Sequence, residues 1–282
     1  MNQLPMSEVK MVVTDLDGTL LQSDQSISPT DNETLERLGN LGVCRVAATG
    51  RNLFKVRQVL NENSPFDYVI LSSGAGIMEW KSQKLLRAMF ITAARTGDII
   101  HYLISEKLNF KVSRELPDNH NFGWWESYDC PELKRYVDHH KKLGDAVKID
   151  PDKPFISSQF LMFFPRDSNQ FELVKEKIQS TFPELSVIRT TSPLDAGYTW
   201  MEIFPNSVSK AHGIEEICRI TGIARENTLG IGNDFNDLEM LDFTHHSYVV
   251  DNAPEELKLK YLISLAHYDD GFSHAVNKHI KR

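Results

Sequence analysis

The feature of the sequence that most constrains its fold is a regular alternation of apolar runs and helical segments near the start of the chain. Val9–Thr14, Val43–Ala48 and Tyr68–Leu71 are short, apolar and rich in β-branched residues, as buried strands are. Apolar residues with helical spacing fill the intervals, roughly from Asp31 to Leu41 and from Asn52 to Asn61. Alternating strands and helices predict a parallel sheet with right-handed crossovers, whose ligands bind at the carboxyl ends of the strands.

The same alternation returns near the end of the chain, after a long interval of different character. We expect a helix from Lys210 to Thr221, strands at Thr228–Ile231 and Ser247–Val250, and a last helix near Phe272 to His279. In the interval, aromatic residues and loop signals are more frequent, and strand-like pieces occur among helices. The expected strands there are Ser158–Phe164 and Thr199–Phe204, and the expected helices are Ala93–Glu106, Cys130–Lys142 and Asn169–Phe182.

This pattern predicts an α/β protein in which one domain is split by the insertion of another. Residues 1–84 and 203–282 are expected to form a Rossmann-like parallel-sheet core. Residues 85–202 are expected to form the inserted α+β domain. The split core would bring the two ends of the chain together in a single sheet.

Composition limits the kinds of partner. The net charge is −8, from 31 Lys and Arg residues against 39 Asp and Glu residues, which argues against a general nucleic-acid-binding protein. No apolar segment approaches the length of a membrane span. Met1 to Lys10 is short and polar, so we expect no signal peptide. Cys44, Cys130 and Cys218 show no paired spacing, which disfavours disulfides and zinc and fits a cytoplasmic protein.

The residues that best indicate chemistry are Asp15–Leu21, directly after the first expected strand. A carboxylate at a strand end, shielded from water, can attack phosphorus and form an acyl-phosphate, and Asp15 has that position. Asp17, two residues on, can protonate the leaving oxygen and later deprotonate water. Gly18 allows a tight turn. Two close carboxylates beside a phosphate favour a hard divalent cation such as Mg²⁺. An ordinary acidic turn is the alternative, and the preceding strand argues against it.

Asp15–Leu21 resembles the first motif of the haloacid dehalogenase superfamily, in particular of its Cof-like phosphatases. The resemblance implies that Asp15 is the nucleophile and a Mg²⁺ ligand. It also implies that Asp17 is the general acid/base and binds the metal through its main-chain carbonyl. Ala48–Arg51 resembles the second motif, in which Thr49 and the following Gly50 would bind phosphate.

Two later segments resemble the remaining motifs. Ser209-Lys210-Ala211 resembles the third motif and implies that Lys210 neutralises the phosphate and Asp15. Gly232–Asp237 resembles the fourth, whose usual form is Gly-Asp-x-x-Asn-Asp, but Asn233 replaces the acidic metal ligand and Asp234 follows one residue late. Either Asn233 binds the metal through its amide oxygen or Asp234 supplies the carboxylate. We favour Asn233, with Asp237 in a supporting role, and a neutral ligand should weaken Mg²⁺ binding.

Further candidates follow from the same resemblance. Asn252, in Asp251–Pro254, would orient the phosphate or the nucleophile loop. Ser73 and Gly74 lie where Cof-like proteins usually have Asn-Gly-Ala, so Ser73 replaces a common substrate-contacting Asn. Arg51, Ser73 and Gly74 are therefore candidate substrate contacts. The size and position of the insertion match the Cof-like cap, in which several arginines could contact the substrate.

Taken together, the sequence predicts a Mg²⁺-dependent phosphatase of small phosphorylated metabolites, such as sugar phosphates, acting through an aspartyl-phosphate intermediate. One alternative is phosphoryl transfer like that of the phosphomannomutases, which have a similar cap. A second is a non-catalytic binding module with a weakened metal site, favoured only by Asn233. The sequence leaves the oligomeric state open.

Overall fold

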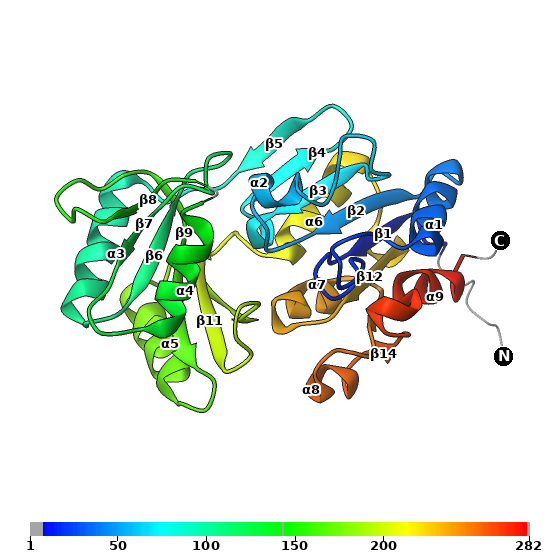
Figure 1. The fold of residues 1–282 in the computed structure, drawn as a ribbon. Coiled ribbons are helices and arrows are strands. Elements are labelled where there is room, and N and C mark those ends of the chain that lie inside the picture. Colours follow the sequence, from blue (N-terminus) through cyan, green and yellow to red (C-terminus); the bar gives the residue numbers. More distant parts are fainter. Residues whose placement is uncertain (1–7, 143, 281–282) are drawn as a thin grey trace. The chain divides into compact units, whose positions relative to one another are not determined.

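The computed structural model describes residues 8–142 and 144–280 and divides the chain into two compact units (Figure 1). The first unit comprises Met1–Arg51, Val56–Arg87 and Ser209–Arg282, and the second comprises Asn52–Lys55 and Ala88–Val208. Residues 1–7, most of the segment in which no signal peptide is expected, lie outside the described residues.

An eight-stranded sheet forms the centre of the first unit, in the order β14-β13-β12-β1-β2-β3-β4-β5. The pairs from β14 to β3 are parallel, and β4 pairs antiparallel to β3. This sheet confirms the expected α/β fold with a parallel-sheet core, although β4, β5 and β14 were not predicted. The strands are β1 (Met11–Thr14), β2 (Cys44–Ala48), β3 (Tyr68–Leu71), β4 (Gly76–Glu79), β5 (Lys84–Ala88), β12 (Thr228–Gly232), β13 (His246–Val249) and β14 (Leu262–Ile263).

Helices of the first unit begin at recognisable caps. The Ser28 side chain accepts a hydrogen bond from the Asp31 N–H at the start of α1, and Ser209 accepts one from the His212 N–H at the start of α6. α6 ends at Gly222, which has a φ of 71° that suits glycine. The helices are α1 (Pro29–Asn40), α6 (Lys210–Thr221), α7 (Leu238–Phe243), α8 (Glu255–Lys258) and α9 (Gly271–Asn277).

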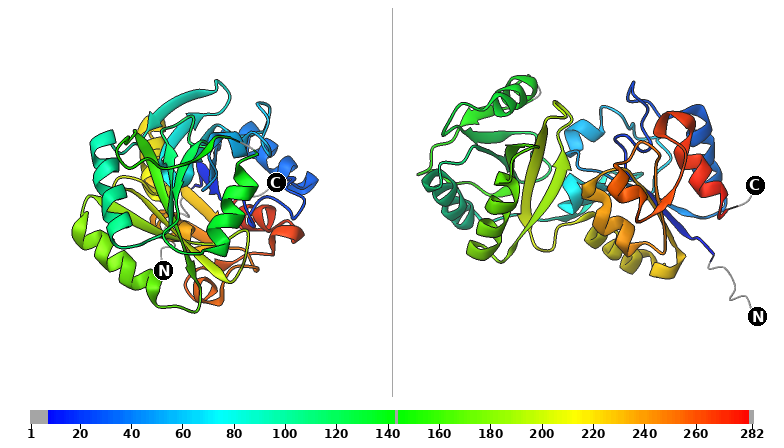
Figure 2. Two further views of the ribbon diagram at one scale, coloured as in Figure 1. Left: turned by 60° about the vertical axis from the view of Figure 1, so that its left-hand side comes forward. Right: turned by 90° about the horizontal axis from the view of Figure 1, so that it is seen from below.

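Apolar side chains of α6 and α7 pack on one face of this sheet. Ile214 and Ile217 of α6 and Met240 of α7 join Val13 and Val46 of the strands in one buried cluster. α1 and α9 contact each other, and Figures 1 and 2 show them side by side. The sheet is therefore buried between helices, and this packing fixes the positions of the carboxyl ends of its strands.

The helix expected from Asn52 to Asn61 is wrong in length, because α2 covers only Leu53–Val56. The Asn52 side chain accepts a hydrogen bond from the Lys55 N–H and so starts the helix. After Val56 the chain turns, with the Val59 N–H bonded three residues back. β-branched residues have a lower helix propensity, which helps to explain the early end.

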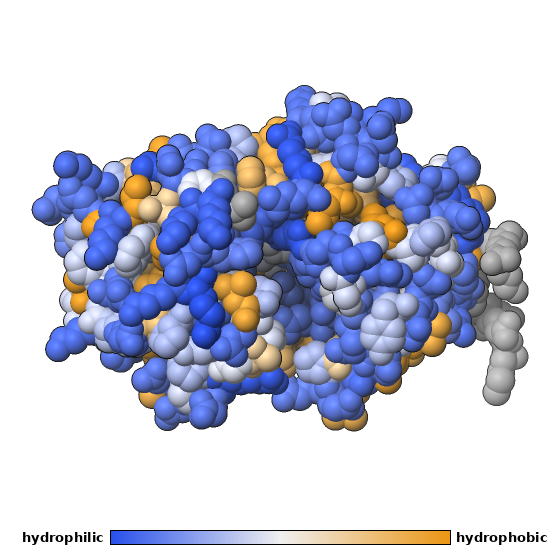
Figure 3. Space-filling view, in the orientation of Figure 1, coloured by the Kyte–Doolittle hydropathy of each residue, from blue (hydrophilic) through white to orange (hydrophobic). Residues whose placement is uncertain are grey.

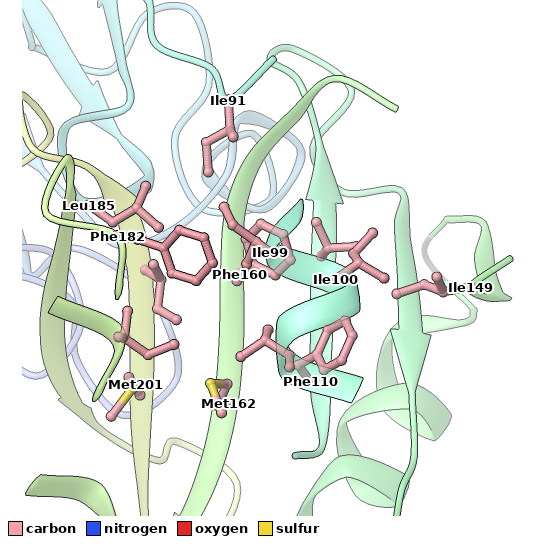
Figure 4. Close-up of a cluster of buried hydrophobic side chains, with 14 of the residues drawn as sticks. Ile91, Ile99, Ile100, Phe110, Ile149, Phe160, Met162, Phe182, Leu185 and Met201 are labelled. Carbon is pink, nitrogen blue, oxygen red and sulfur yellow. The ribbon is translucent and has the colours of Figure 1, made fainter. Parts of the chain in front are cut away.

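A six-stranded sheet forms the second unit, in the order β10-β11-β9-β6-β7-β8, and every pair except β7–β8 is antiparallel. α3 and α5 cover one face and bury the apolar cluster of Figure 4, and α4 packs on the other face. β6, β7, β8 and β10 were not predicted. The elements are α3 (Ala93–Ser105), β6 (Phe110–Arg114), β7 (Phe122–Trp125), α4 (Pro131–His140), β8 (Ala146–Lys148), β9 (Ser157–Pro165), α5 (Gln170–Thr181), β10 (Leu185–Thr191) and β11 (Tyr198–Pro205).

Within the described residues, no helix combines the length and the apolar character needed to cross a membrane. Hydrophilic residues dominate the face of the molecule in Figure 3, where apolar residues occur in small groups.

Candidate active site

Polar residues follow the parallel strands of the first unit where each strand ends. Asp15 follows β1, Thr49 follows β2, Ser72 follows β3 and Asn233 follows β12, and Asp251 lies two residues after the end of β13. Parallel strands end at one edge of a sheet, so these segments meet there. Main-chain hydrogen bonds hold them in register, for example from the Asp15 N–H to the Ile231 carbonyl at 2.9 Å.

A buried ion cluster lies at this edge. Nζ of Lys210 is 2.6 Å from Oδ1 of Asp15 and 2.6 Å from Oδ1 of Asp237. The side chains of Lys210 and Asp237 are 0% exposed, and that of Asp15 is 6% exposed. One ammonium group is therefore shared between two carboxylates, and it compensates charges that would otherwise be costly to bury.

The protonation of this cluster reflects burial and an excess of negative charge. Burial raises the pKa of Asp15 to about 8, with Asp237 and Asp17 adding to the rise and Lys210 opposing it. Burial opposes the charge on Lys210, but Asp15 and Asp237 outweigh it and raise the pKa of Lys210 above its ordinary value. A further positive charge near Asp15 would relieve this imbalance.

Asp237 braces the loop that follows β12. Its Oδ2 accepts hydrogen bonds from the Asn233 N–H at 2.8 Å and from the Asp234 N–H at 3.1 Å. Its Oδ1 is bonded to Lys210. A Cβ atom on Gly232 would lie 2.6 Å from Oδ2 of Asp237, so the loop needs glycine there. Both oxygens of Asp237 therefore hold protein groups, which fits the supporting role expected of this residue.

Asn233 and Asn252 both lie against the turn at Gly18. Gly18 has a φ of 70°, and a Cβ atom there would lie 2.6 Å from Nδ2 of Asn233. Nδ2 of Asn252 donates a hydrogen bond to the Gly18 carbonyl at 2.9 Å. Oδ1 of Asn252 accepts one from the His267 N–H at 3.0 Å. Asn252 thus ties the turn after β1 to the loop before α9, a link to His267 that the sequence did not predict.

Arg51 links the second-motif segment to Asp17. Thr49 is fully buried, and its Oγ1 accepts a hydrogen bond from the Arg51 N–H at 3.1 Å across Gly50. Nε of Arg51 donates to Oδ2 of Asp17 at 2.7 Å, and Nη2 donates to Oδ1 at 2.5 Å. Nη2 also donates to Oε1 of Gln25. The contacts of Arg51 to Asp17 and Gln25 were not predicted, because no local pattern indicates them.

The turn after β3 packs on the start of α6. Ser73 has a φ of 57° and Gly74 a φ of 113°, and both are buried. A Cβ atom on Gly74 would lie 2.2 Å from the carbonyl oxygen of Ser209. This close approach explains the glycine and positions the residue that precedes Lys210.

The oxygen atoms at this edge suit a hard cation such as Mg²⁺. In the part of the chain that the structure describes, no three His, Cys, Asp or Glu side chains converge as a metal site. A metal would therefore also need neutral oxygens, such as the Asp17 carbonyl and the Asn233 amide. The negative charge around Asp15 favours such an ion, so the residues present fit it.

The fold and the site together define a class of protein. It is an α/β protein with a buried Asp–Lys–Asp cluster at the carboxyl edge of a parallel sheet. The chain belongs to the haloacid dehalogenase-like hydrolase family, whose sequence model matches residues 12–276. This confirms the family expected from the motifs.

Known proteins resemble the chain over nearly its whole length. It is 25% identical over 268 residues to the 5-amino-6-(5-phospho-D-ribitylamino)uracil phosphatase of Bacillus subtilis, covering 89% of this chain and 91% of the relative. It is 25% identical over 256 residues to the HMP-PP phosphatase of Cronobacter sakazakii, covering 90% and 89%. A phosphatase structure from Bacteroides thetaiotaomicron matches with a TM-score of 0.78 and 18% identity, covering 99% and 98%. The comparisons confirm the expected enzyme class, a phosphoric monoester hydrolase.

Proposed function

We propose that the protein hydrolyses small phosphorylated metabolites, such as sugar phosphates, through a phosphorylated Asp15. The observation that carries this proposal is the buried Asp15 carboxylate, fixed by Lys210 at the end of β1. Lys210 holds Oδ1, so Oδ2 is the oxygen expected to attack phosphorus. The relatives named as phosphatases of small phosphorylated compounds support this substrate class.

The reaction has two steps in this proposal. Asp15 attacks phosphorus while the bond to the leaving oxygen breaks, and Asp17 gives that oxygen a proton. Water then attacks the aspartyl-phosphate, Asp17 takes a proton from it, and phosphate leaves Asp15. Lys210 neutralises the phosphate charge, Thr49 donates a hydrogen bond to it, and Asn252 holds the turn at Gly18.

The proposed Mg²⁺ ligands are Asp15, the Asp17 carbonyl and Asn233, with Asp234 as the alternative to Asn233. Mg²⁺, when bound, supplies positive charge to the phosphate oxygens. Asp237 keeps the loop of Asn233 in place through its hydrogen bonds to the main chain.

We further propose that the first unit is the catalytic core and the second unit is the cap that selects the leaving group. The second unit has its own sheet and its own apolar cluster, as a separate domain requires.

A panel of phosphorylated metabolites assayed with Mg²⁺ tests this function. Wild type should release free phosphate, and Asp15→Asn should lose nearly all activity because an amide is a poor nucleophile. Asp98→Asn, at an exposed ion pair of α3, is the matched control and should keep wild-type activity. Equal activity in wild type and Asp15→Asn would end the nucleophile assignment. An isomeric sugar phosphate in place of free phosphate would indicate a mutase.

A further inference from the structure

Arg51 makes a two-point contact with Asp17, and the two reaction steps proposed above assign no role to this contact. The guanidinium binds both carboxylate oxygens, Nε to Oδ2 at 2.7 Å and Nη2 to Oδ1 at 2.5 Å. The Asp17 side chain is 48% exposed and the Arg51 side chain 15% exposed. A carboxylate this exposed would otherwise sample several rotamers, because exposed side chains reorient rapidly.

Arg51 is itself held at both ends. Its N–H donates to Oγ1 of Thr49, and its carbonyl accepts a hydrogen bond from the Ser72 N–H at 2.9 Å. Its guanidinium also reaches Oε1 of Gln25, in a turn closed by a hydrogen bond from the Gln22 N–H to the Ser26 carbonyl. Arg51 therefore connects Asp17 to the ends of two strands and to the 22–26 turn.

An exposed ion pair contributes about 0–1 kcal/mol to stability, so stability alone is a weak reason for this arrangement. Its geometry is more informative. The planar fork of Arg fixes the plane and direction of a carboxylate, which the ammonium of Lys cannot do. Each carboxylate oxygen has two lone pairs, and the fork occupies one on each. Each oxygen of Asp17 therefore keeps a second lone pair, which can carry the transferred proton.

We propose that Arg51 is a positioning residue that orients Asp17 toward the leaving oxygen of the substrate. The inference rests on the proposed function and changes the role of Arg51 from a substrate contact to a support for the acid. In the first step, the bond from phosphorus to the leaving oxygen breaks, and that oxygen takes the Asp17 proton. In the second, water returns a proton to Asp17. Arg51 keeps its protons throughout, since guanidinium does not deprotonate in proteins.

The dependence of the rate on the leaving group tests this role. An alkyl phosphate needs a proton on its leaving oxygen, whereas p-nitrophenyl phosphate releases a stable phenolate that does not. Arg51→Gln should lower kcat/KM for an alkyl phosphate by about 100-fold, the lower end of general acid–base effects, and change kcat/KM for p-nitrophenyl phosphate by less than about fivefold. We compare kcat/KM because it reports the step in which the leaving oxygen departs, whereas kcat also includes hydrolysis of the aspartyl-phosphate, which is the same for both substrates. Asp17→Asn should give the same selective pattern, and the double variant should lose little more.

Two further variants serve as controls. Arg51→Lys keeps the charge but not the fork, so it should retain the selective defect on the alkyl phosphate. Arg57→Gln removes an exposed arginine that binds Gln83 and should leave both rates unchanged. Circular dichroism and thermal unfolding confirm that each variant is folded.

Several outcomes would overturn the positioning role while leaving the phosphatase intact. One is an equal loss on both substrates, carried by KM, which would show that Arg51 binds the phosphate. Another is an unchanged rate on both substrates. A third is full recovery of the alkyl phosphate rate in Arg51→Lys. If Asp15→Asn turns over p-nitrophenyl phosphate as fast as wild type, the proposed function itself fails, and this inference fails with it.

Discussion

Replacing Lys210 with Met tests whether the buried ammonium is needed to hold the two carboxylates. Met is of similar length but carries no charge, so Asp15 and Asp237 would remain buried side by side without a cation. Lys210 makes two charge-assisted hydrogen bonds, each 2.6 Å long, and its side chain is 0% exposed. Breaking a buried ion pair costs about 3–5 kcal/mol, and we expect the free energy of unfolding to fall by that amount at neutral pH.

The loss should depend on pH, with a sign that follows from Asp15. Burial places the folded-state pKa of Asp15 at about 8, above its usual 3.8, and removal of Lys210 removes the group that opposes this rise. The folded variant then binds a proton that the unfolded chain lacks between these values. Its stability should therefore fall as pH rises from about 4, and that of wild type falls alongside it up to about pH 8, where wild-type Asp15 loses its proton. Above that pH only the variant continues to lose stability through Asp15, so its deficit relative to wild type should be larger at about pH 9 than at about pH 6.

Urea unfolding in EDTA, followed by circular dichroism at both pH values, measures the loss. Each unit has its own core, so the curves are fitted for two transitions, and only that of the first unit should move. Lys260→Met is the matched control, because Lys260 forms a 2.8 Å ion pair with Asp242 in the same unit but is 51% exposed. Its effect should stay within about 1 kcal/mol. Equal losses in the two variants would refute the reasoning.

Two other substitutions test the metal ligands and the strand-end packing. Asn233→Asp restores a charged ligand and should strengthen Mg²⁺ binding about tenfold or more, measured by calorimetry. An unchanged affinity, with a loss in Asp234→Asn, would make Asp234 the ligand instead. Gly74→Ala places a methyl group 2.2 Å from the Ser209 carbonyl oxygen at a φ of 113°, and should destabilise the first unit by about 2–4 kcal/mol in urea unfolding. Gly42→Ala, at a φ of 73° with no atom within 4 Å, should cost only about 1 kcal/mol, and equal losses would argue against the clash.

The sequence was most informative where a local pattern decides the structure. β3 (Tyr68–Leu71) and α6 (Lys210–Thr221) have the predicted bounds, because apolar runs and cap residues are encoded within a few positions. The residues expected at strand ends lie at one edge for the same reason: a parallel sheet brings its carboxyl ends together. Asp15 and Lys210, predicted as partners, are in direct contact.

Contacts between distant segments were beyond what local patterns encode. The contact of Gly74 with Ser209 and the hydrogen bond from His267 to Asn252 depend on how loops pack in three dimensions. The two-point contact between Arg51 and Asp17 depends on where β1 and β2 end relative to each other in the sheet. β4 was not predicted because the residues just before it are typical of a turn. Its antiparallel pairing with β3 depends on tertiary packing, which a local pattern does not encode.

The position of β1 has a consequence for synthesis of the chain. β1 lies between β2 and β12, and Met11 pairs with Cys44 on one side and with Thr228 on the other. On the ribosome, β1 and β2 emerge early, while one edge of β1 has no strand to pair with until Thr228–Gly232 is made. The intervening Ala88–Val208, which carries nearly all of the second unit, emerges as one continuous stretch and can fold first. A stall in translation within that stretch would leave an unprotected strand edge, a known route to aggregation.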